Sequence, residues 1–159
     1  MIGLCWNVLG LGNPRAFAAL RRLMKKHSPD LVFLSKTKSN GFKADNVKVS
    51  LGFNNCFSVD SCGNSGGLLL LWKDSIVVSV LSFSSGHIDA RISMSDGFVW
   101  HFSGFYGDPN PNKRRFSWSL LRRLRDTNSL SWVYGDNFNE LLSMSDKAGG
   151  SDKSFSGML

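Results

Sequence analysis

The polar residues that follow one short apolar run are the first candidates for chemistry in this sequence. Trp132-Val133-Tyr134 ends at Gly135, and the side chains beyond it offer carboxylate and amide oxygens. They are Asp136, Asn137, Asn139 and Glu140. A buried strand that stops at a Gly and presents such oxygens is a common way to build a metal or phosphate site. Taken alone, the stretch favours a plain strand and turn, because Gly-Asp-Asn is common in turns.

Composition and charge bound the class of protein. The 159 residues suffice for one domain with a hydrophobic core, and 42% hydrophobic with 19% charged residues is typical of globular chains. Nineteen Lys and Arg against twelve Asp and Glu give a net charge of +7, which favours a polyanionic partner such as nucleic acid. Cys5, Cys56 and Cys62 form no disulfide framework or zinc motif. With no signal peptide and no membrane-length apolar run, we expect an intracellular protein without a membrane partner.

The first 35 residues have the pattern of a strand, a helix and a second strand. Ile2–Val8 and Leu31–Leu34 are apolar runs of strand length. Between them, Asn13 and Pro14 are typical of a helix N-terminus. An apolar stripe at helical spacing follows, formed by Phe17, Leu20, Leu23 and Met24. The pattern predicts a βαβ start and a layered α/β fold.

The middle of the chain consists of short apolar runs separated by turns. Ser39–Leu51, which precedes them, is polar, and we expect it to be irregular or weakly helical. The predicted strands are Asn55–Val59, Gly67–Trp72, Ile76–Phe83, His87–Ser93 and Phe98–Tyr106. Their close spacing predicts an antiparallel meander. Phe98, Trp100 and Phe102 occupy alternate positions, so we expect the last strand to have one buried face.

A second amphipathic helix is predicted from about Lys113 to Asp126. Phe116, Leu120 and Leu124 are expected to face inward. The outer faces of both predicted helices are strongly basic. The candidate nucleic-acid contacts on the second helix are Arg114, Arg115, Arg122 and Arg123. A basic helix face suits solvent as well as phosphate, and the sequence leaves both interpretations open.

Six segments, taken in order, resemble one family. They are CWNVLGLGNPRAFAALRRL, SPDLVFLSKTK, SGGLLLLWKDSI, HIDA, FSGFYGDPNPNKRRFSWSLLRRL and SWVYGDNFNELLSMSDKAGG. The first two are similar to the family patterns "SWNCRGLGNPR…ALRRL" and "PDLVFLMETK". Together the segments resemble the N-terminal endonuclease domain of plant LINE-type (non-LTR) retrotransposon polyproteins, within the endonuclease/exonuclease/phosphatase superfamily. The resemblance covers Met1 to about Gly150.

The resemblance implies a fold and an activity. The fold is α/β (α+β): a partial four-layered α/β sandwich of mixed, mostly antiparallel sheets flanked by helices. Residues 1–150 would form the N-terminal two-thirds of the domain and 151–159 a divergent or disordered tail. The activity is hydrolysis of DNA phosphodiesters with a divalent metal, usually Mg²⁺, which supplies a Lewis acid beside an oriented water. Asn7 matches the metal-binding Asn, Tyr106 the Tyr that contacts the phosphate region, and Asn139 the Asn of the "GDFN" motif.

Three departures from the family pattern concern the chemistry itself. Lys36 stands where the family has its metal-binding Glu, which puts a cation at a cation site. Asn137 stands at the "GDFN" Asp, and an amide cannot act as a general base. Asp136 lies one residue early, where its side chain points to the other face of an extended segment. The chain also ends before the family's late "SDH" His.

We therefore expect a truncated, degenerate copy in which Mg²⁺ binding and hydrolysis are lost. The candidate catalytic residues are Tyr106, Asp136 and Asn139, and the candidate metal ligand is Asn7. A non-catalytic basic remnant that binds the DNA phosphate backbone is one alternative. An unexpressed retroelement fragment without a stable fold is another. The family also implies a nuclear location, since an element endonuclease must reach chromosomal DNA.

Overall fold

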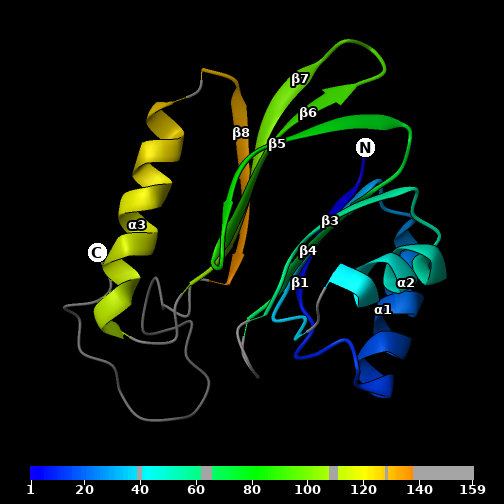
Figure 1. Ribbon diagram of the computed structural model, residues 1–159. Coiled ribbons are helices and arrows are strands. Elements are labelled where there is room, and N and C mark those ends of the chain that lie inside the picture. Colours follow the sequence, from blue (N-terminus) through cyan, green and yellow to red (C-terminus); the bar gives the residue numbers. More distant parts are fainter. Residues whose placement is uncertain (39–40, 62–65, 108–110, 128, 138–159) are drawn as a thin grey trace, which may run out of the picture.

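Two β-sheets packed face to face, with helices on their outer sides, make up the fold (Figure 1). The computed structural model describes residues 1–38, 41–61, 66–107, 111–127 and 129–137. The first sheet has the order β1-β2-β4-β3, formed by β1 (Gly3–Asn7), β2 (Leu31–Ser35), β3 (Asn55–Val59) and β4 (Leu68–Trp72). The second has the order β5-β6-β7-β8, formed by β5 (Ile76–Ser84), β6 (His87–Met94), β7 (Val99–Tyr106) and β8 (Ser131–Asn137).

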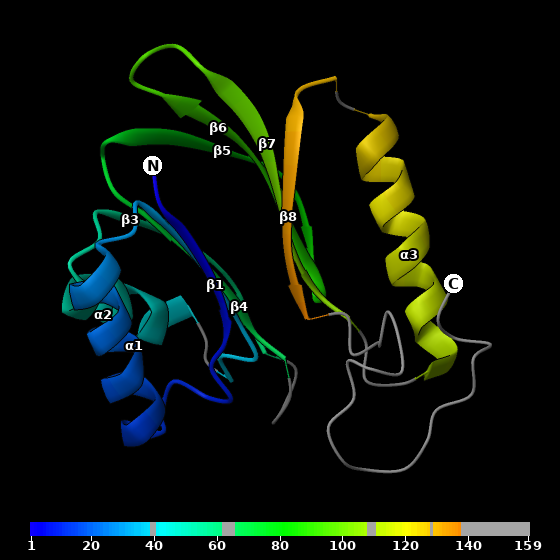
Figure 2. The ribbon, with the colours of Figure 1, turned by 180° about the vertical axis from the view of Figure 1, so that it is seen from behind.

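Three helices in the described part of the chain complete the four layers. They are α1 (Pro14–His27), α2 (Gly41–Leu51) and α3 (Pro111–Asp126). Seen from both sides, α1 and α2 cover the first sheet, while α3 covers the second (Figures 1 and 2). Both sheets are mixed, because β1–β2 and β7–β8 are parallel and the other pairs are antiparallel. The predicted α/β sandwich with mixed sheets flanked by helices is thereby confirmed.

The predicted βαβ start is also confirmed. β1 and β2 are parallel neighbours, and α1 connects them. Asn13 caps this helix, since its side-chain oxygen accepts a hydrogen bond from the Arg15 backbone N–H at 3.0 Å. Leu20 and Met24 are buried on the inward face. The apolar stripe therefore positions α1 on the sheet, as its spacing predicts.

The predicted single meander is wrong. β3 and β4 complete the first sheet, whereas β5, β6 and β7 form an antiparallel unit in the second. Of the two alternatives for the segment before them, irregular or weakly helical, the structure has the helix, since Gly41–Leu51 forms α2. Ala44 and Val47 are buried beside Phe53 in the core that α2 shares with the first sheet. Tertiary packing thus stabilises a helix whose sequence alone has little amphipathic character.

β7 is buried on both faces, contrary to the prediction of one. Trp100 and Phe102 lie in the core between the sheets. His101 and Ser103 point to the other side and are only 1% and 0% exposed, because α3 covers that side. The prediction that Phe116 faces inward is also wrong, since this side chain is 61% exposed.

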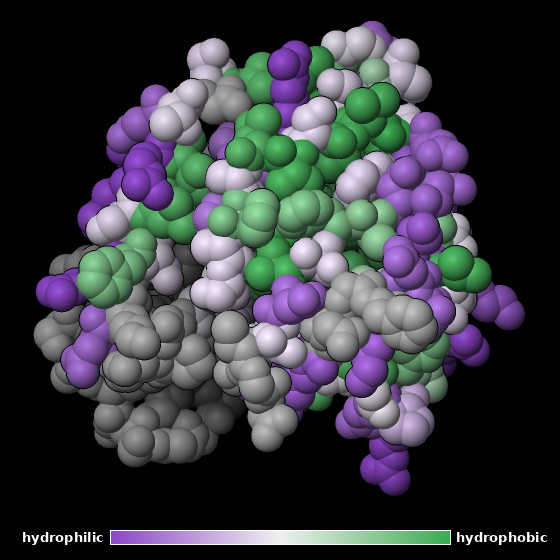
Figure 3. All heavy atoms as spheres, viewed as in Figure 1, coloured by the Kyte–Doolittle hydropathy of each residue, from purple (hydrophilic) through white to green (hydrophobic). Residues whose placement is uncertain are grey.

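The hydrophobic surface gathers over one edge of the second sheet. Figure 3 shows hydrophobic residues near the middle of this view, with hydrophilic surface over the helices on either side. Val77, Leu81 and Phe83 of β5 are all more than half exposed. Among the described residues, no helix has the length and hydrophobicity that crossing a membrane requires.

Candidate active site at the carboxyl ends of the strands

The two parallel strand pairs bring most of the predicted site positions to strand ends. β1 and β2 run in register from Gly3↔Leu31 to Asn7↔Ser35, and Lys36 follows directly. β7 and β8 run in register to Tyr106↔Asn137. Since the strands of a parallel pair end at the same edge of their sheet, each pair presents its last residues together.

Close contacts between the sheets align these two edges. A Cβ added to Gly135 of β8 would lie 2.1 Å from the Cys5 sulfur of β1. One added to Gly104 of β7 would lie 2.4 Å from the Phe33 ring of β2. Both strand pairs therefore finish at one end of the sandwich, the lower end in Figure 1. We call it the strand-end edge.

Asn7 has the chemistry of a ligand-binding residue at this edge. Its side-chain oxygen Oδ1 is buried and accepts no hydrogen bond from the described part of the chain. A buried acceptor without a donor costs on the order of 1–3 kcal/mol, so its retention suggests a ligand or cation beside it. This atom is the structural feature that best fits the predicted metal-binding role of Asn7.

The loop that follows β2 is held rigidly beside Asn7. The backbone N–H groups of Val8 and Gly10 donate to the carbonyls of Ser35 and Lys36, at 3.1 and 2.9 Å. Lys36 adopts a left-handed φ of 56°, which is uncommon for a residue other than Gly. The backbone of Lys36 is thus fixed at the strand-end edge.

The residues that the structure describes do not fit a divalent cation. Asn7 offers one oxygen, but Lys36 brings a positive charge to the adjacent strand end. Among the described side chains, which do not include that of Asp136, no three or more His, Cys, Asp or Glu form a possible metal-binding group. Mg²⁺ prefers several oxygen ligands with at least one carboxylate, and a nearby ammonium opposes its binding.

The structure describes the remaining predicted catalytic residues only in part. Tyr106 ends β7 and is 8% exposed, with its side chain in the core between the sheets. Asp136 and Asn137 end β8, where only their backbone is described. Asn139, like the predicted tail 151–159, lies outside the described residues. Their catalytic roles stay predictions.

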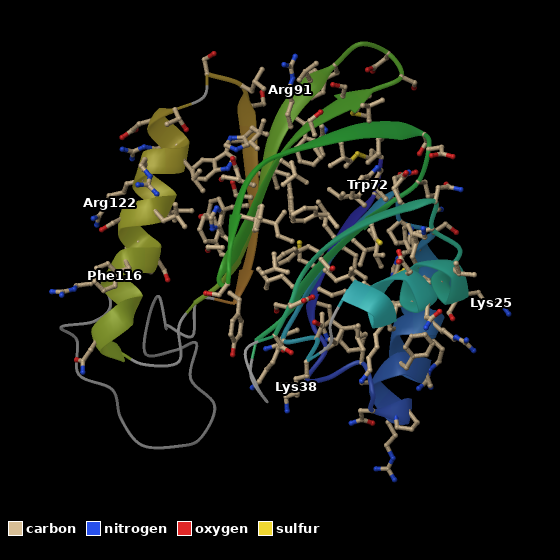
Figure 4. All side chains as sticks on the ribbon, viewed as in Figure 1. Lys25, Lys38, Trp72, Arg91, Phe116 and Arg122 are labelled. Atoms are coloured by element: carbon tan, nitrogen blue, oxygen red, sulfur yellow. The ribbon has the colours of Figure 1, made fainter. Side chains whose placement is uncertain are left out.

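The basic helix α3 lies on the outside of the second sheet. Arg115, Arg122 and Arg123 are exposed, whereas the side chain of Arg114 is not described. Figure 4 shows Arg122 projecting from the middle of the helix on the side away from the sheet. Since α1 and α3 cover opposite faces of the sandwich, their basic surfaces are separate.

A buried polar cluster beneath α3 was not anticipated from the sequence. Asp89 Oδ1 is hydrogen-bonded to His101 Nε2 and accepts the Ser103 hydroxyl at 2.6 Å. The Trp132 indole N–H donates to the Ser103 oxygen at 2.9 Å, and its ring stacks on His101. The cluster links β6, β7 and β8 below the helix. A Ser103 that donates to the carboxylate is not an activated nucleophile, so we assign the cluster a structural role.

His87 extends this polar layer toward α3. Its two ring nitrogens are hydrogen-bonded to the hydroxyls of Ser82 and Ser84, at 3.0 and 2.6 Å. It lines a cavity of about 820 Å³ between α3 and the sheet, together with Arg123. Burial lowers the pKa of His87; the Asp89 carboxylate acts in the opposite direction, and the Arg123 guanidinium lowers it further.

The depressed pKa of His87 predicts a pH-dependent stability. The unfolded chain binds a proton near pH 6.5, where the folded chain does not, so acid favours unfolding. We expect the contribution of His87 to the free energy of unfolding to be constant above about pH 7 and to fall as the pH drops through about 6.5. Urea unfolding at a series of pH values from above about 7 to below about 6.5 measures this free energy. His87→Gln should flatten the profile, whereas the exposed His27→Gln should not; equal profiles would contradict the assignment.

Comparisons with known proteins agree with this architecture. Residues 4–134, well over half of the chain, match the Endonuclease/Exonuclease/phosphatase family. None of the curated proteins matches the chain.

Three solved structures represent the structural likeness. The human Nocturnin catalytic domain with bound sulfate superposes with a TM-score of 0.65 and 13% identity, over 86% of this chain and 62% of that one. D. rerio TDP2 complexed with single-strand DNA product superposes with a TM-score of 0.64 and 15% identity, over 87% of this chain and 60% of that one. The endonuclease domain of TRAS1, a telomere-specific non-LTR retrotransposon, superposes with a TM-score of 0.59 and 10% identity, over 84% of this chain and 57% of that one. The chain thus spans less than two thirds of each structure. By its sequence match and its fold, the chain belongs to the endonuclease/exonuclease/phosphatase family.

Proposed function

We propose that this chain is a degenerate nuclease domain that binds DNA phosphates at the strand-end edge without hydrolysing them. The observation that carries the proposal is the buried Asn7 oxygen without a hydrogen-bond donor at the end of β1, with Lys36 directly after the adjacent end of β2. Family membership and the likeness to D. rerio TDP2 complexed with single-strand DNA product and to the TRAS1 endonuclease domain support nucleic acid as the partner. The finer identity, a plant LINE-type element working in the nucleus, rests on the resemblance of the motifs.

The chain's own residues account for binding better than for bond cleavage. The Lys36 ammonium attracts a phosphate directly and holds it by charge. Hydrolysis needs a group that takes a proton from the attacking water, and Asn137 cannot do so. A divalent metal, where the family uses one, polarises the phosphate and activates water, and Asn7 is the described residue that would help to hold it. Lys36 opposes that arrangement.

Calorimetry with Mg²⁺ tests this proposal on the whole chain. We expect no binding by the natural sequence, and binding by the triple variant Lys36→Glu, Asp136→Gly, Asn137→Asp, which restores the family's carboxylates. In parallel, supercoiled plasmid with Mg²⁺ should show no nicking above the level of Asn139→Ala. Metal-dependent nicking by the natural chain that Asn139→Ala abolishes would refute the loss of catalysis.

A non-catalytic basic remnant is the second candidate, and exposed arginines on α3 favour it. Arg115, Arg122 and Arg123 offer charge for phosphate contact without requiring the strand-end edge. DNA retention that is unchanged by the triple variant but lost in Arg122→Ala, Arg123→Ala would assign binding to α3. Retention that depends on Lys36 would assign it to the edge.

A further inference from the structure

A cavity lies directly beside the strand-end edge, between the loop after β1 and helix α2. It measures about 590 Å³ and is lined by Leu9–Asn13, Phe17, Lys38 and one side of α2. Lys38 is two residues beyond Lys36, and Leu9 is two residues beyond Asn7. The cavity therefore shares both of its loops with the candidate active site.

The backbone around this cavity is unusually constrained. Four non-glycine residues in the described part of the chain have positive φ, and three of them lie here: Leu9, Lys36 and Lys38, at 54°, 56° and 52°. The fourth, Ser28, is explained by its position as the C-cap of α1. Left-handed backbone at such residues is strained and persists where the surroundings fix it, commonly at ligand sites.

Hydrogen bonds from both sides hold the lysine loop in this conformation. The Leu11 N–H donates to the Thr37 carbonyl at 3.0 Å, on the side of the β1 loop. On the other side, the N–H groups of Thr37 and Lys38 donate to the carbonyls of Gly67 and Gly66, at 3.1 and 3.0 Å. The backbone of Lys38 is therefore fixed in place before any ligand binds, which lowers the entropy cost of binding.

The lining combines positive charge with an apolar wall. Lys38 and Lys43 bring two amines to the cavity, and the described lining contains no Asp or Glu. The side chains of Leu9, Leu11 and Phe17 supply apolar surface, although Leu9 is 58% exposed to solvent. Two amines beside an apolar wall suit a ligand that is anionic at one end and flat and weakly polar at the other. The volume falls within the range of small-molecule sites, about 300–1,000 Å³.

We propose that this cavity binds one unstacked nucleotide of a DNA strand, with its phosphate at Lys38 and Lys43 and its base against the wall of Leu9, Leu11 and Phe17. The inference rests on the proposed function, because it assumes that the strand passes the adjacent strand-end edge. It goes further in naming the bound form: a strand end or an extruded base, since a base stacked in a duplex cannot enter the cavity. The site needs no metal.

Calorimetric titration with deoxyadenosine 5′-monophosphate in EDTA tests the site. Lys38→Ala is expected to weaken binding about tenfold through loss of one charged contact. Gly12→Leu adds a side chain at a lining position where a new Cβ meets nothing within 4 Å, so it should block the cavity without a clash. Lys25→Ala is the matched control, because this exposed lysine lies on α1 away from Lys38 (Figure 4).

The outcomes separate this site from the function on which it rests. Inorganic phosphate and deoxyadenosine should each bind more weakly than the nucleotide, and single-stranded oligonucleotides more tightly than duplex of equal length. Nucleotide binding that survives both Lys38→Ala and Gly12→Leu would overturn the site, as would phosphate binding equal to nucleotide binding. Duplex retention without any nucleotide binding would overturn the site alone. Absence of all DNA binding at low salt would overturn the proposed function as well.

Discussion

Asp89→Ala is expected to lower the free energy of unfolding by about 3–5 kcal/mol. The substitution removes the acceptor of His101 and Ser103, which are only 1% and 0% exposed. It also releases the Ser103 oxygen that orders Trp132. Domains of this size are stable by only about 5–15 kcal/mol, so the variant should be close to unfolding at 37 °C. Urea or thermal unfolding measures the loss.

Asp96→Ala provides the control for this experiment. Asp96 accepts a single hydrogen bond, from the Phe98 backbone N–H at 2.9 Å, in an exposed turn of the same sheet. Its loss should cost no more than about 1 kcal/mol. Asp89→Asn, which keeps one acceptor oxygen but no charge, should fall between the two. Equal losses for Asp89→Ala and Asp96→Ala would show that the buried cluster does not stabilise the fold.

Gly104→Ala should destabilise the protein by about 1–3 kcal/mol, as overpacking does in a close-packed core. The new Cβ would lie 2.4–2.7 Å from three atoms of the Phe33 ring. That ring is 2% exposed and packs edge-on against Phe102, so it has no space to retreat. One sheet must move away from the other, and the melting temperature should fall accordingly.

Two further variants decide whether the clash with Phe33 is the cause. Gly12→Ala places its Cβ where nothing lies within 4 Å, so it should leave stability unchanged or slightly raised. Phe33→Leu removes the ring atoms that Gly104→Ala would strike. The double variant should therefore lose less stability than the sum of the two single variants. Strict additivity would show that the sheets are not held apart at this contact.

The parts of the fold that local sequence controls were predictable. Asn13 and Pro14 marked the start of α1 because capping depends on neighbouring residues alone. The order of the six motifs identified the family, and the family implied the layered sandwich. The motifs sufficed because they extend over most of the chain. Lys36 was identified by the same route, from one position in one motif.

The unpredicted parts depend on neighbours that are distant in sequence. Nothing in the sequence near β4 indicates that the next strand belongs to another sheet, so the spacing of the strands predicts a single meander. In β6, Asp89 alternates with Ile88 and Ala90, a pattern that normally places the polar residue in solvent. Only the position of α3 buries it. The left-handed backbone at Leu9, Lys36 and Lys38 has no sequence signal either, because these residue types usually avoid it.

The contact between Cys5 and Gly135 has a consequence for how the chain folds. It joins the first strand to the last one described, so the strand-end edge requires the closure of nearly the longest loop that the described chain permits. Such non-local contacts slow folding, because the closure entropy is lost before the contact is gained. During synthesis, β1, α1 and β2 emerge early, and their contacts with β8 cannot form until that strand has been made. The candidate site is therefore assembled after translation of β8, and until then the side of β1 that carries Cys5 is open to chaperones.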